Sequence, residues 1–246
     1  MVQSVSAGAI FQEALRIVVR QSLPAVSRRD IMAVLEAGRR EPLEFLYEAG
    51  VEADLPHQAI VSRGAAVYFN FCAGGLSDDL SDGDCTYLAE PYRLGPCTQA
   101  ILQTLFLDAL VAASLPGTTL AAVAQELIAA VGPQHVELRT KQWTARVFRQ
   151  VALGIGGRQW SAYLQILWHG TDLAPRAARI GTSAGIATIV MEDIESHDRR
   201  YSTLSKKHKQ EILRWAISAA EALRDEHLRC LDALLRTIDP VLRAAQ

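Results

Sequence analysis

The sequence predicts an all-α protein, and three observations support this prediction. Apolar residues recur at helical spacing nearly from end to end, whereas sustained two-residue alternation and Asn-Gly hairpin turns are absent. Half of the 246 residues are hydrophobic and 21% are charged, which is typical of a folded chain with a sizeable core. No linker, repeat or shift in composition divides the chain. We therefore expect a single domain over residues 1–246, a bundle of about ten helices.

The nine prolines separate the helical patterns, because proline favours the start of a helix and interrupts one that has begun. In order, the helices are expected near 9–22, 28–37, 43–53, 57–79, 97–114, 118–131, 136–153, 158–169, 174–197 and 206–236. Gly154-Ile-Gly-Gly157 is expected to break the helical path between two of them. The segment 211–235 has apolar residues at helical spacing, as expected of a core helix or of the surface of a homodimer.

Charge and cysteine content exclude several classes of protein. The formal net charge is −2 and the pI is about 6.3, so there is no global basic field to hold a nucleic acid. The four cysteines form no Cys-x-x-Cys pair, which indicates reduced thiols rather than a disulfide frame or a zinc site. Residues 1–10 lack the pattern of a secretion signal, and Gln103 and Asp108 interrupt the apolar stretch 100–115. We expect a cytoplasmic protein without a membrane span.

An acidic cluster follows the apolar helix expected over 57–79. Asp78 and Asp82 are four residues apart, so on a helix their carboxylates project from one face, and Asp79 and Asp84 lie beside them. Negative charge at a helix C-terminus opposes the helix dipole, and hard divalent cations such as Mg²⁺ prefer oxygen ligands of this kind. The cluster predicts a magnesium site, with a solvated acidic loop as the alternative.

A second cluster repeats this arrangement at the end of the helix expected over 174–197. Glu192, Asp193 and Ser196 lie there, with Glu192 and Ser196 four residues apart and Arg200 one step further along the same face. If the two acidic helix ends face each other, they would hold metal ions that bridge a polyvalent phosphate. The basic residues near both clusters, which would bind that anion, are Arg93, Arg199, Arg200, Lys206, Lys207 and Lys209.

His197-Asp198 offers a different interpretation, the paired ligands of a helical metal phosphohydrolase of the His-Asp type. That family needs further His and Asp ligands, and the other five histidines show no matching frame. We therefore do not favour this interpretation.

Asp78-Asp-Leu-Ser-Asp82 resembles the Asp-Asp-x-x-Asp motif of the class I isoprenoid synthases, the superfamily of trans-prenyl diphosphate synthases and terpene synthases. Gly38-Arg-Arg-Glu-Pro42 is similar to a degenerate form of the basic motif that binds isopentenyl diphosphate in prenyl synthases. Arg93-Leu-Gly95 is similar to their Arg-Arg-Gly segment, and Glu192-Asp-Ile-Glu-Ser196 stands in the place of the second metal motif. The resemblance covers residues 35–210, and it implies the isoprenoid synthase fold, Mg²⁺ as the cofactor and a prenyl diphosphate as the substrate.

The second motif departs from the prenyl synthase pattern. Its Glu192 and Ser196 are closer to the Asn/Asp-Asp-x-x-Ser-x-x-x-Glu motif of terpene synthases, yet Arg200 stands where that motif ends in an acid. Because the upstream basic motif is also eroded, the resemblance favours ionisation of an allylic prenyl diphosphate followed by cyclisation or elimination. The alternatives are a trans-prenyltransferase that condenses the allylic diphosphate with isopentenyl diphosphate, and a non-catalytic subunit that regulates a catalytic partner.

The resemblance also implies roles for single residues. The metal ligands would be Asp78, Asp79, Asp82, Glu192, Asp193 and Ser196. Arg146 stands 46 residues before the second motif, at the place of the diphosphate-sensing arginine of terpene synthases, and Arg149 is one turn away. We expect Arg200 to face the diphosphate rather than the metal. The diphosphate-binding set would be Arg93, Arg146, Arg149, Arg200 and Lys206. The residues acting directly in ionisation would be Asp78, Asp79, Asp82 and Arg146.

Substrate length is expected to depend on the helix that carries the first motif. In this fold, the residues four and five positions before the first Asp line the cavity, and here they are the small Gly74 and Ala73. Phe71 lies deeper, so a tail of more than two isoprene units should fit above it. Trp160 and Tyr163 are candidate aromatic walls that would stabilise an allylic cation, with ordinary core aromatics as the alternative.

Overall fold

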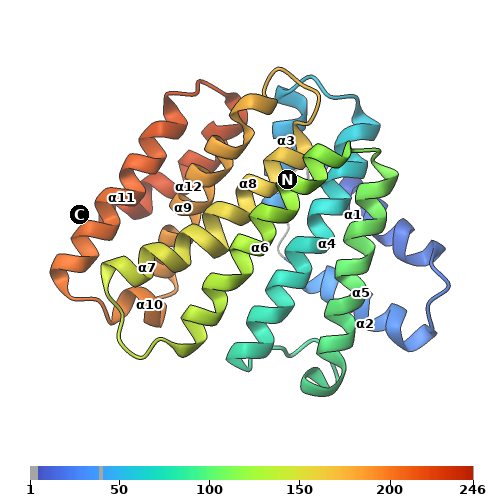
Figure 1. Ribbon diagram of the computed structural model, residues 1–246, viewed down its shortest axis with the longest axis horizontal. Coiled ribbons are helices and arrows are strands. Elements are labelled where there is room, and N and C mark those ends of the chain that lie inside the picture. Colours follow the sequence, from blue (N-terminus) through green and yellow to red (C-terminus); the bar gives the residue numbers. More distant parts are fainter. Residues whose placement is uncertain (1–4, 39–40, 246) are drawn as a thin grey trace. The chain divides into compact units, whose positions relative to one another are not determined.

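The computed structural model describes residues 5–38 and 41–245, and within these ranges the chain is helical and has no strand (Figure 1). The all-α class predicted from the sequence is therefore confirmed. The basic motif Gly38–Pro42 lies partly outside the described residues, because the structure does not describe its arginines Arg39 and Arg40.

Contacts within the chain define two compact units, Met1–Leu115 and Pro116–Gln246. The sequence has no linker at this boundary, and Pro116 simply precedes the next helix. The single domain over 1–246 stays a prediction, and the two units are described separately below.

The first unit is built around one long helix, α4. Its helices are α1 (Val5–Arg20), α2 (Ala25–Ala37), α3 (Glu41–Glu52), α4 (His57–Asp82) and α5 (Pro91–Ala112). α4 packs against α1, α3 and α5, and Figure 1 shows it alongside α5. Small residues permit this close approach: a Cβ added at Gly64 would lie 2.6 Å from the side chain of Ile10 on α1. α4 extends three residues beyond its predicted end, so the whole first acidic motif is helical.

α5 begins at Pro91, before the expected start at residue 97, and Pro96 lies within its second turn. A proline near a helix N-terminus removes few hydrogen bonds, which explains why α5 tolerates it. Among the described residues, α5 is the helix long and apolar enough, by length and composition, to cross a membrane, and 39% of its most apolar window is buried. This is weak evidence for a span, because core helices of soluble proteins have the same properties. The absence of a membrane span stays a prediction.

The second unit is built around α9. Its elements are α6 (Gly117–Arg139), α7 (Ala145–Ala152), the π-helical turn η1 (Leu153–Arg158), α8 (Gln159–Leu167), the 3₁₀ turn η2 (Ala174–Arg176), α9 (Ala177–Glu195), α10 (Arg199–Ser202), α11 (Lys206–Arg224) and α12 (Arg229–Ala244). α9 packs against α8, η1, α11 and α12. The second acidic motif lies at its C-terminal end.

Glycines bring α9 into backbone contact with α8 and η1. A Cβ on Gly185 would lie 2.3 Å from the carbonyl oxygen of Gly156, and one on Gly181 would lie 2.4 Å from that of Trp160. The glycines at 154–157 were expected to break the helix, but they form a π turn inside one helical path from α7 to α8. This turn is where the backbone of α9 approaches most closely.

Other boundaries also differ from the predicted ones, and the helix expected over 136–153 begins only at Ala145. α6 continues through Pro133 to Arg139, and the Pro133 ring occupies the space beside Gly154, where an added Cβ would lie 2.2 Å from it. The helix expected over 206–236 is instead two helices, because the chain turns at His227, whose φ is 55°. The apolar faces of these helices are buried, for example at Leu213 and Leu231, so they belong to the core of the second unit.

Candidate functional site

The first acidic motif occupies the last turns of α4. Asp78 and Asp82 are exposed and lie four residues apart on one continuous helix, as the spacing predicts. Gly83 ends the helix with a φ of 83°, and its N–H, like that of Asp84, donates to the carbonyl oxygen of Asp79. The glycine turn thus stops the helix directly after the last aspartate and leaves the Asp78 and Asp82 side chains at an open helix end.

Asp79 has a different environment from its two neighbours. Its Oδ2 accepts a hydrogen bond of 2.6 Å from the hydroxyl of Tyr87, which the loop after α4 brings back toward the helix. Burial raises the pKa of the Tyr87 hydroxyl well above its usual value, and the bond and charge of Asp79 raise it further. Tyr87 therefore remains a donor at physiological pH. It was not predicted, because Tyr87 lies in the loop beyond the end of α4, where helical spacing no longer relates it to Asp79.

A magnesium ion fits this helix end together with ligands from outside the protein. Among the described residues, no three acidic, histidine or cysteine side chains converge as a metal cluster. Mg²⁺, however, commonly keeps several waters and binds through one or two carboxylates plus substrate phosphates. The exposed pair Asp78 and Asp82 suits an ion held in that way.

The other residues predicted in the first unit are placed as follows. Arg93 is exposed in the first turn of α5 and pairs with Glu90 at 2.8 Å. Ala73 is buried, whereas Phe71 and Gly74 are half-buried. Arg93 therefore offers an accessible cation, and Gly74 retains an accessible surface on α4.

The second motif does not present its side chains as expected. The hydroxyl of Ser196 donates to the backbone carbonyl oxygen of Glu192 at 2.8 Å, which satisfies its hydrogen atom within the helix. Asp193 is buried, its side chain being 2% exposed, and its Oδ1 accepts a hydrogen bond of 2.6 Å from Arg200. Its Oδ2 is buried and has no hydrogen-bond partner among the described residues. Asp193 therefore points into the second unit and not toward a site for a solvated metal.

Arg200 also differs from its expected role. Its side chain is only 13% exposed, and the guanidinium contacts Glu137 at 2.7 Å, Asp193 at 2.6 Å and Asp198 at 3.2 Å. It thus faces three carboxylates of its own unit instead of an external diphosphate. Asp198 also caps α10 by accepting from the N–H of Arg200, so the pair His197-Asp198 is not arranged as metal ligands.

The charged groups around Arg200 shift one another's pKa values. Burial alone would lower the pKa of Arg200, but the charges of Asp193, Glu137 and Asp198 raise it above its usual value. Burial raises the pKa of Asp193 to about 7, against the lowering effect of Arg200. The apolar side chains around Asp193 and Arg200 leave no space for a water molecule in the crevice between these residues of the second unit. The lining apolar residues are Phe148, Val151, Ala152, Ile155 and Ile189.

The remaining predicted cations lie on three other positions of the second unit. Arg146 is exposed at the start of α7, and Lys206 is exposed at the start of α11. Arg149 lies 5.6 Å from the ring centroid of Trp215 and pairs with Glu211 at 3.3 Å. Arg146 and Lys206 are therefore the more accessible candidates for binding an anion.

The two predicted aromatic walls are both on α8. Trp160 and Tyr163 are buried, and their ring centroids are 6.3 Å apart. This spacing is typical of a packed aromatic pair. Their role as cavity walls stays a prediction.

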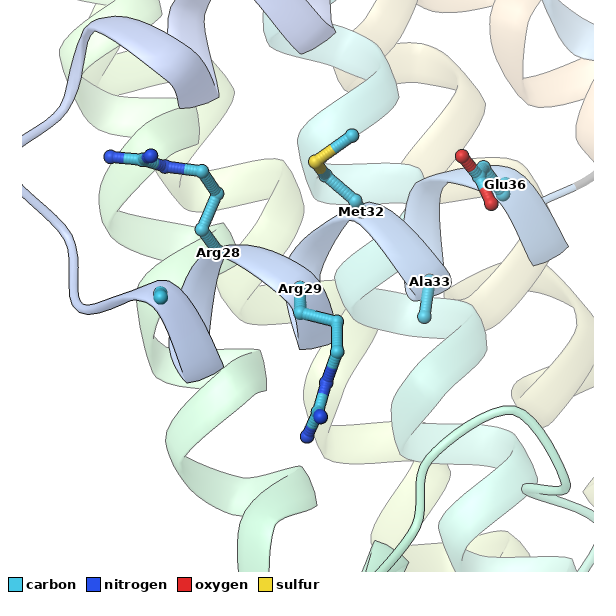
Figure 2. Close-up of a pocket in the computed structure, with 6 residues that line it drawn as sticks. Arg28, Arg29, Met32, Ala33 and Glu36 are labelled. Atoms are coloured by element: carbon cyan, nitrogen blue, oxygen red, sulfur yellow. The ribbon is translucent and has the colours of Figure 1, made fainter.

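A hollow of about 400 Å³ lies on the first unit, and none of the residues predicted for the site lines it. It is formed along α2, where Arg28 and Arg29 extend in different directions from the helix (Figure 2). Arg28 donates to the carbonyl oxygen of Gln21, and Arg29 pairs with Asp30 at 3.3 Å. Arg28 thus joins α2 to the turn that precedes it, whereas Arg29 pairs only with its neighbour in sequence.

Neither a protein-family model nor a curated protein matches this sequence. Solved structures, in contrast, match along nearly the whole chain. The geranyltranstransferase of Thermotoga maritima has a TM-score of 0.71 at 15% identity, with 97% of this chain and 98% of that chain covered. A geranylgeranyl pyrophosphate synthetase of the archaeon Geoglobus acetivorans has a TM-score of 0.73 at 11% identity, with 96% and 98% covered.

An isoprenoid synthase family member from Thermotoga neapolitana is equally similar, with a TM-score of 0.72 at 16% identity and with 98% and 99% of the two chains covered. These similarities agree with the fold that the two acidic motifs imply. The chain therefore has the isoprenoid synthase fold, that of the trans-prenyl diphosphate synthases.

Proposed function

We propose that this chain is a Mg²⁺-dependent enzyme that transfers an allylic prenyl group from its diphosphate to isopentenyl diphosphate. The observation that carries the proposal is the exposed pair Asp78 and Asp82 at the end of α4, in a chain with the isoprenoid synthase fold. Two of the similar structures are named as prenyl-transferring enzymes, which supports transfer. The cyclisation reaction favoured by the sequence has no comparable support.

In this proposal, Asp78 and Asp82 hold Mg²⁺ against the substrate's diphosphate. The bound ion would stabilise the charge that develops on the diphosphate as the allylic C–O bond breaks. The accessible cation Arg93, in the same unit as Asp78 and Asp82, would bind phosphate oxygens. Arg146 and Lys206 of the second unit are given this role by the resemblance alone. The electron pair of the broken bond leaves with the diphosphate, the acceptor double bond supplies the pair for the new C–C bond, and the acceptor then loses a proton.

Product analysis tests the reaction class. The purified chain would be incubated with C10, C15 and C20 allylic diphosphates, each with and without isopentenyl diphosphate and Mg²⁺. Longer prenyl diphosphates formed only with both additions support transfer. Diphosphate release with a hydrocarbon product and no acceptor would instead identify a terpene synthase.

The metal site is tested by replacing Asp78 and Asp82 together with Asn. We expect Mg²⁺-dependent turnover to be lost while helical content, measured by circular dichroism, is unchanged. Asp84→Asn is the matched control, because Asp84 is exposed just beyond the helix end and is outside the proposed pair. Full activity in the double variant would contradict the proposed site.

A second candidate is a non-catalytic subunit that regulates a catalytic partner. The enclosed pair Arg200 and Asp193 favours it, because Asp193 is a predicted metal ligand and is instead buried against Arg200. Absence of any turnover by the chain alone, with a change in the turnover or product of a partner synthase when the chain is added to it, would support this candidate. A cytoplasmic location and a homodimer remain our expectations for either function.

A further inference from the structure

The second acidic motif already contains a cation that belongs to the protein. Glu137 from α6, Asp193 from α9 and Asp198 before α10 all contact the guanidinium of Arg200, at 2.7, 2.6 and 3.2 Å. These carboxylates come from three segments of the second unit, and they converge on one positive group. A planar guanidinium with five donors can satisfy several carboxylate oxygens at once.

Because of these contacts, Asp193 has no accessible carboxylate oxygen to offer a magnesium ion. One of its oxygens is already bonded to Arg200, and the other is buried beside a crevice in this unit that has no space for a water molecule. Mg²⁺ requires near-octahedral oxygen ligands and usually retains several of its waters. Asp193 therefore cannot serve as a ligand of this ion while Arg200 is in place.

We propose that Arg200 takes the place of a metal ion in the second motif, so that it joins the ends of α6 and α9 as an internal cation and the motif binds no divalent metal. Divalent metal would then bind at the first motif alone, and this part of the inference rests on the proposed function. The contacts of Arg200 are independent of the proposed function.

The first test removes the first motif and asks whether a metal site remains. Mn²⁺ alone would be titrated into the full chain carrying Asp78→Asn and Asp82→Asn at pH 8, and the free ion counted by electron paramagnetic resonance. We expect no bound Mn²⁺. Binding that disappears when Asp193→Asn is added would overturn the proposal. This arm leaves Arg200 unchanged, so it is decisive even if a variant at Arg200 fails to fold.

The second test removes the internal cation. In the same background, where we expect no bound Mn²⁺, Arg200→Gln should create a Mn²⁺ site, because Glu137, Asp193 and Asp198 would lose their shared positive partner. Arg200→Lys should create none, since it keeps the charge, and Asp193→Asn should abolish the gained site. A folded Arg200→Gln variant that gains no Mn²⁺ would contradict the proposal.

Arg158→Gln is the matched control for this gain. Arg158 pairs with Glu126 at 3.1 Å in the same unit, but its partner is a single carboxylate. Its loss should create no Mn²⁺ site. Loss of turnover in the Asp78 and Asp82 variant bears on the proposed function, whereas the Mn²⁺ count at Arg200 bears only on this inference, so the two can fail separately.

Discussion

Tyr87 donates a hydrogen bond of 2.6 Å to Oδ2 of Asp79, and this contact divides the three aspartates of the first motif into two kinds. Asp78 and Asp82 are exposed at the end of α4, whereas one oxygen of Asp79 is held by the loop that follows. The motif therefore combines two exposed carboxylates with a third that holds the following loop.

Tyr87→Phe removes this hydroxyl and should lower the free energy of unfolding by about 1 kcal/mol. This is less than is usual for a hydrogen bond to a charged group, because both side chains are partly exposed. Urea denaturation measures the change. Tyr92→Phe is the control, since Tyr92 lies in the same region and is 72% exposed. Equal effects of the two substitutions would mean that the bond to Asp79 adds no stability.

The pH dependence of stability should involve Glu226, which lies in the turn between α11 and α12. Burial would raise the pKa of its carboxyl, but hydrogen bonds from Arg179 and Arg176 outweigh burial and lower it below the usual 4.5. The folded state thus binds this proton less readily than the unfolded state. The stabilisation should be fully present above pH 4.5 and be lost as the pH falls through the lower, folded-state pKa.

Glu226→Gln should cost about 1–2 kcal/mol at pH 7, less than a fully buried pair because both arginines are partly exposed. The variant should also lose this part of the acid dependence in urea denaturation between pH 2 and pH 7. Glu221→Gln, an exposed change on α11, is the control. If the Glu226 variant loses stability at acid pH to the same extent as the wild type, other carboxylates are responsible for the acid dependence.

Gly185→Ala should strongly destabilise the protein, by about 4 kcal/mol or more, because the new Cβ would lie 2.3 Å from the carbonyl oxygen of Gly156. Backbone on both sides leaves no flexible side chain to move away. Gly75→Ala on α4 has nothing within 4 Å of its added Cβ and should be neutral or stabilising by up to about 1 kcal/mol. Thermal unfolding of both variants provides the measurement, and similar melting temperatures would refute the tight crossing of α9 and η1.

Gly74→Phe should reduce turnover of the longest accepted allylic diphosphate more than that of the shortest, because only a long tail would reach the added ring. The ratio of kcat/KM values for the two substrates provides the measurement. Gly75→Phe is the control, since Gly75 is the adjacent residue and has open space around it. Equal losses for all chain lengths at Gly74 would indicate a folding defect instead of a limit on length.

The spacing of residues along the sequence was sufficient to predict the all-helical class and the placement of Asp78 and Asp82 on one helix face. Helix formation depends on contacts between residues three and four apart, so the positions of Asp78 and Asp82 on one face follow from their separation as soon as α4 reaches Asp82. The apolar spacing that predicts α4 and α9 is local in the same sense. The resemblance of the two acidic motifs to those of isoprenoid synthases then indicated the fold that the structural comparisons support.

Tertiary structure decided which way the second motif faces. Spacing places Glu192 and Ser196 on one face of a helix, but it cannot say which face the neighbouring helices cover, and here Asp193 is the covered residue. Nor does helical spacing extend to Arg200, because α9 ends at Glu195 and the chain turns at His197, where φ is 55°. That turn folds Arg200 back onto Asp193 and brings both to Glu137 on α6, a contact between residues 63 positions apart that no local pattern encodes.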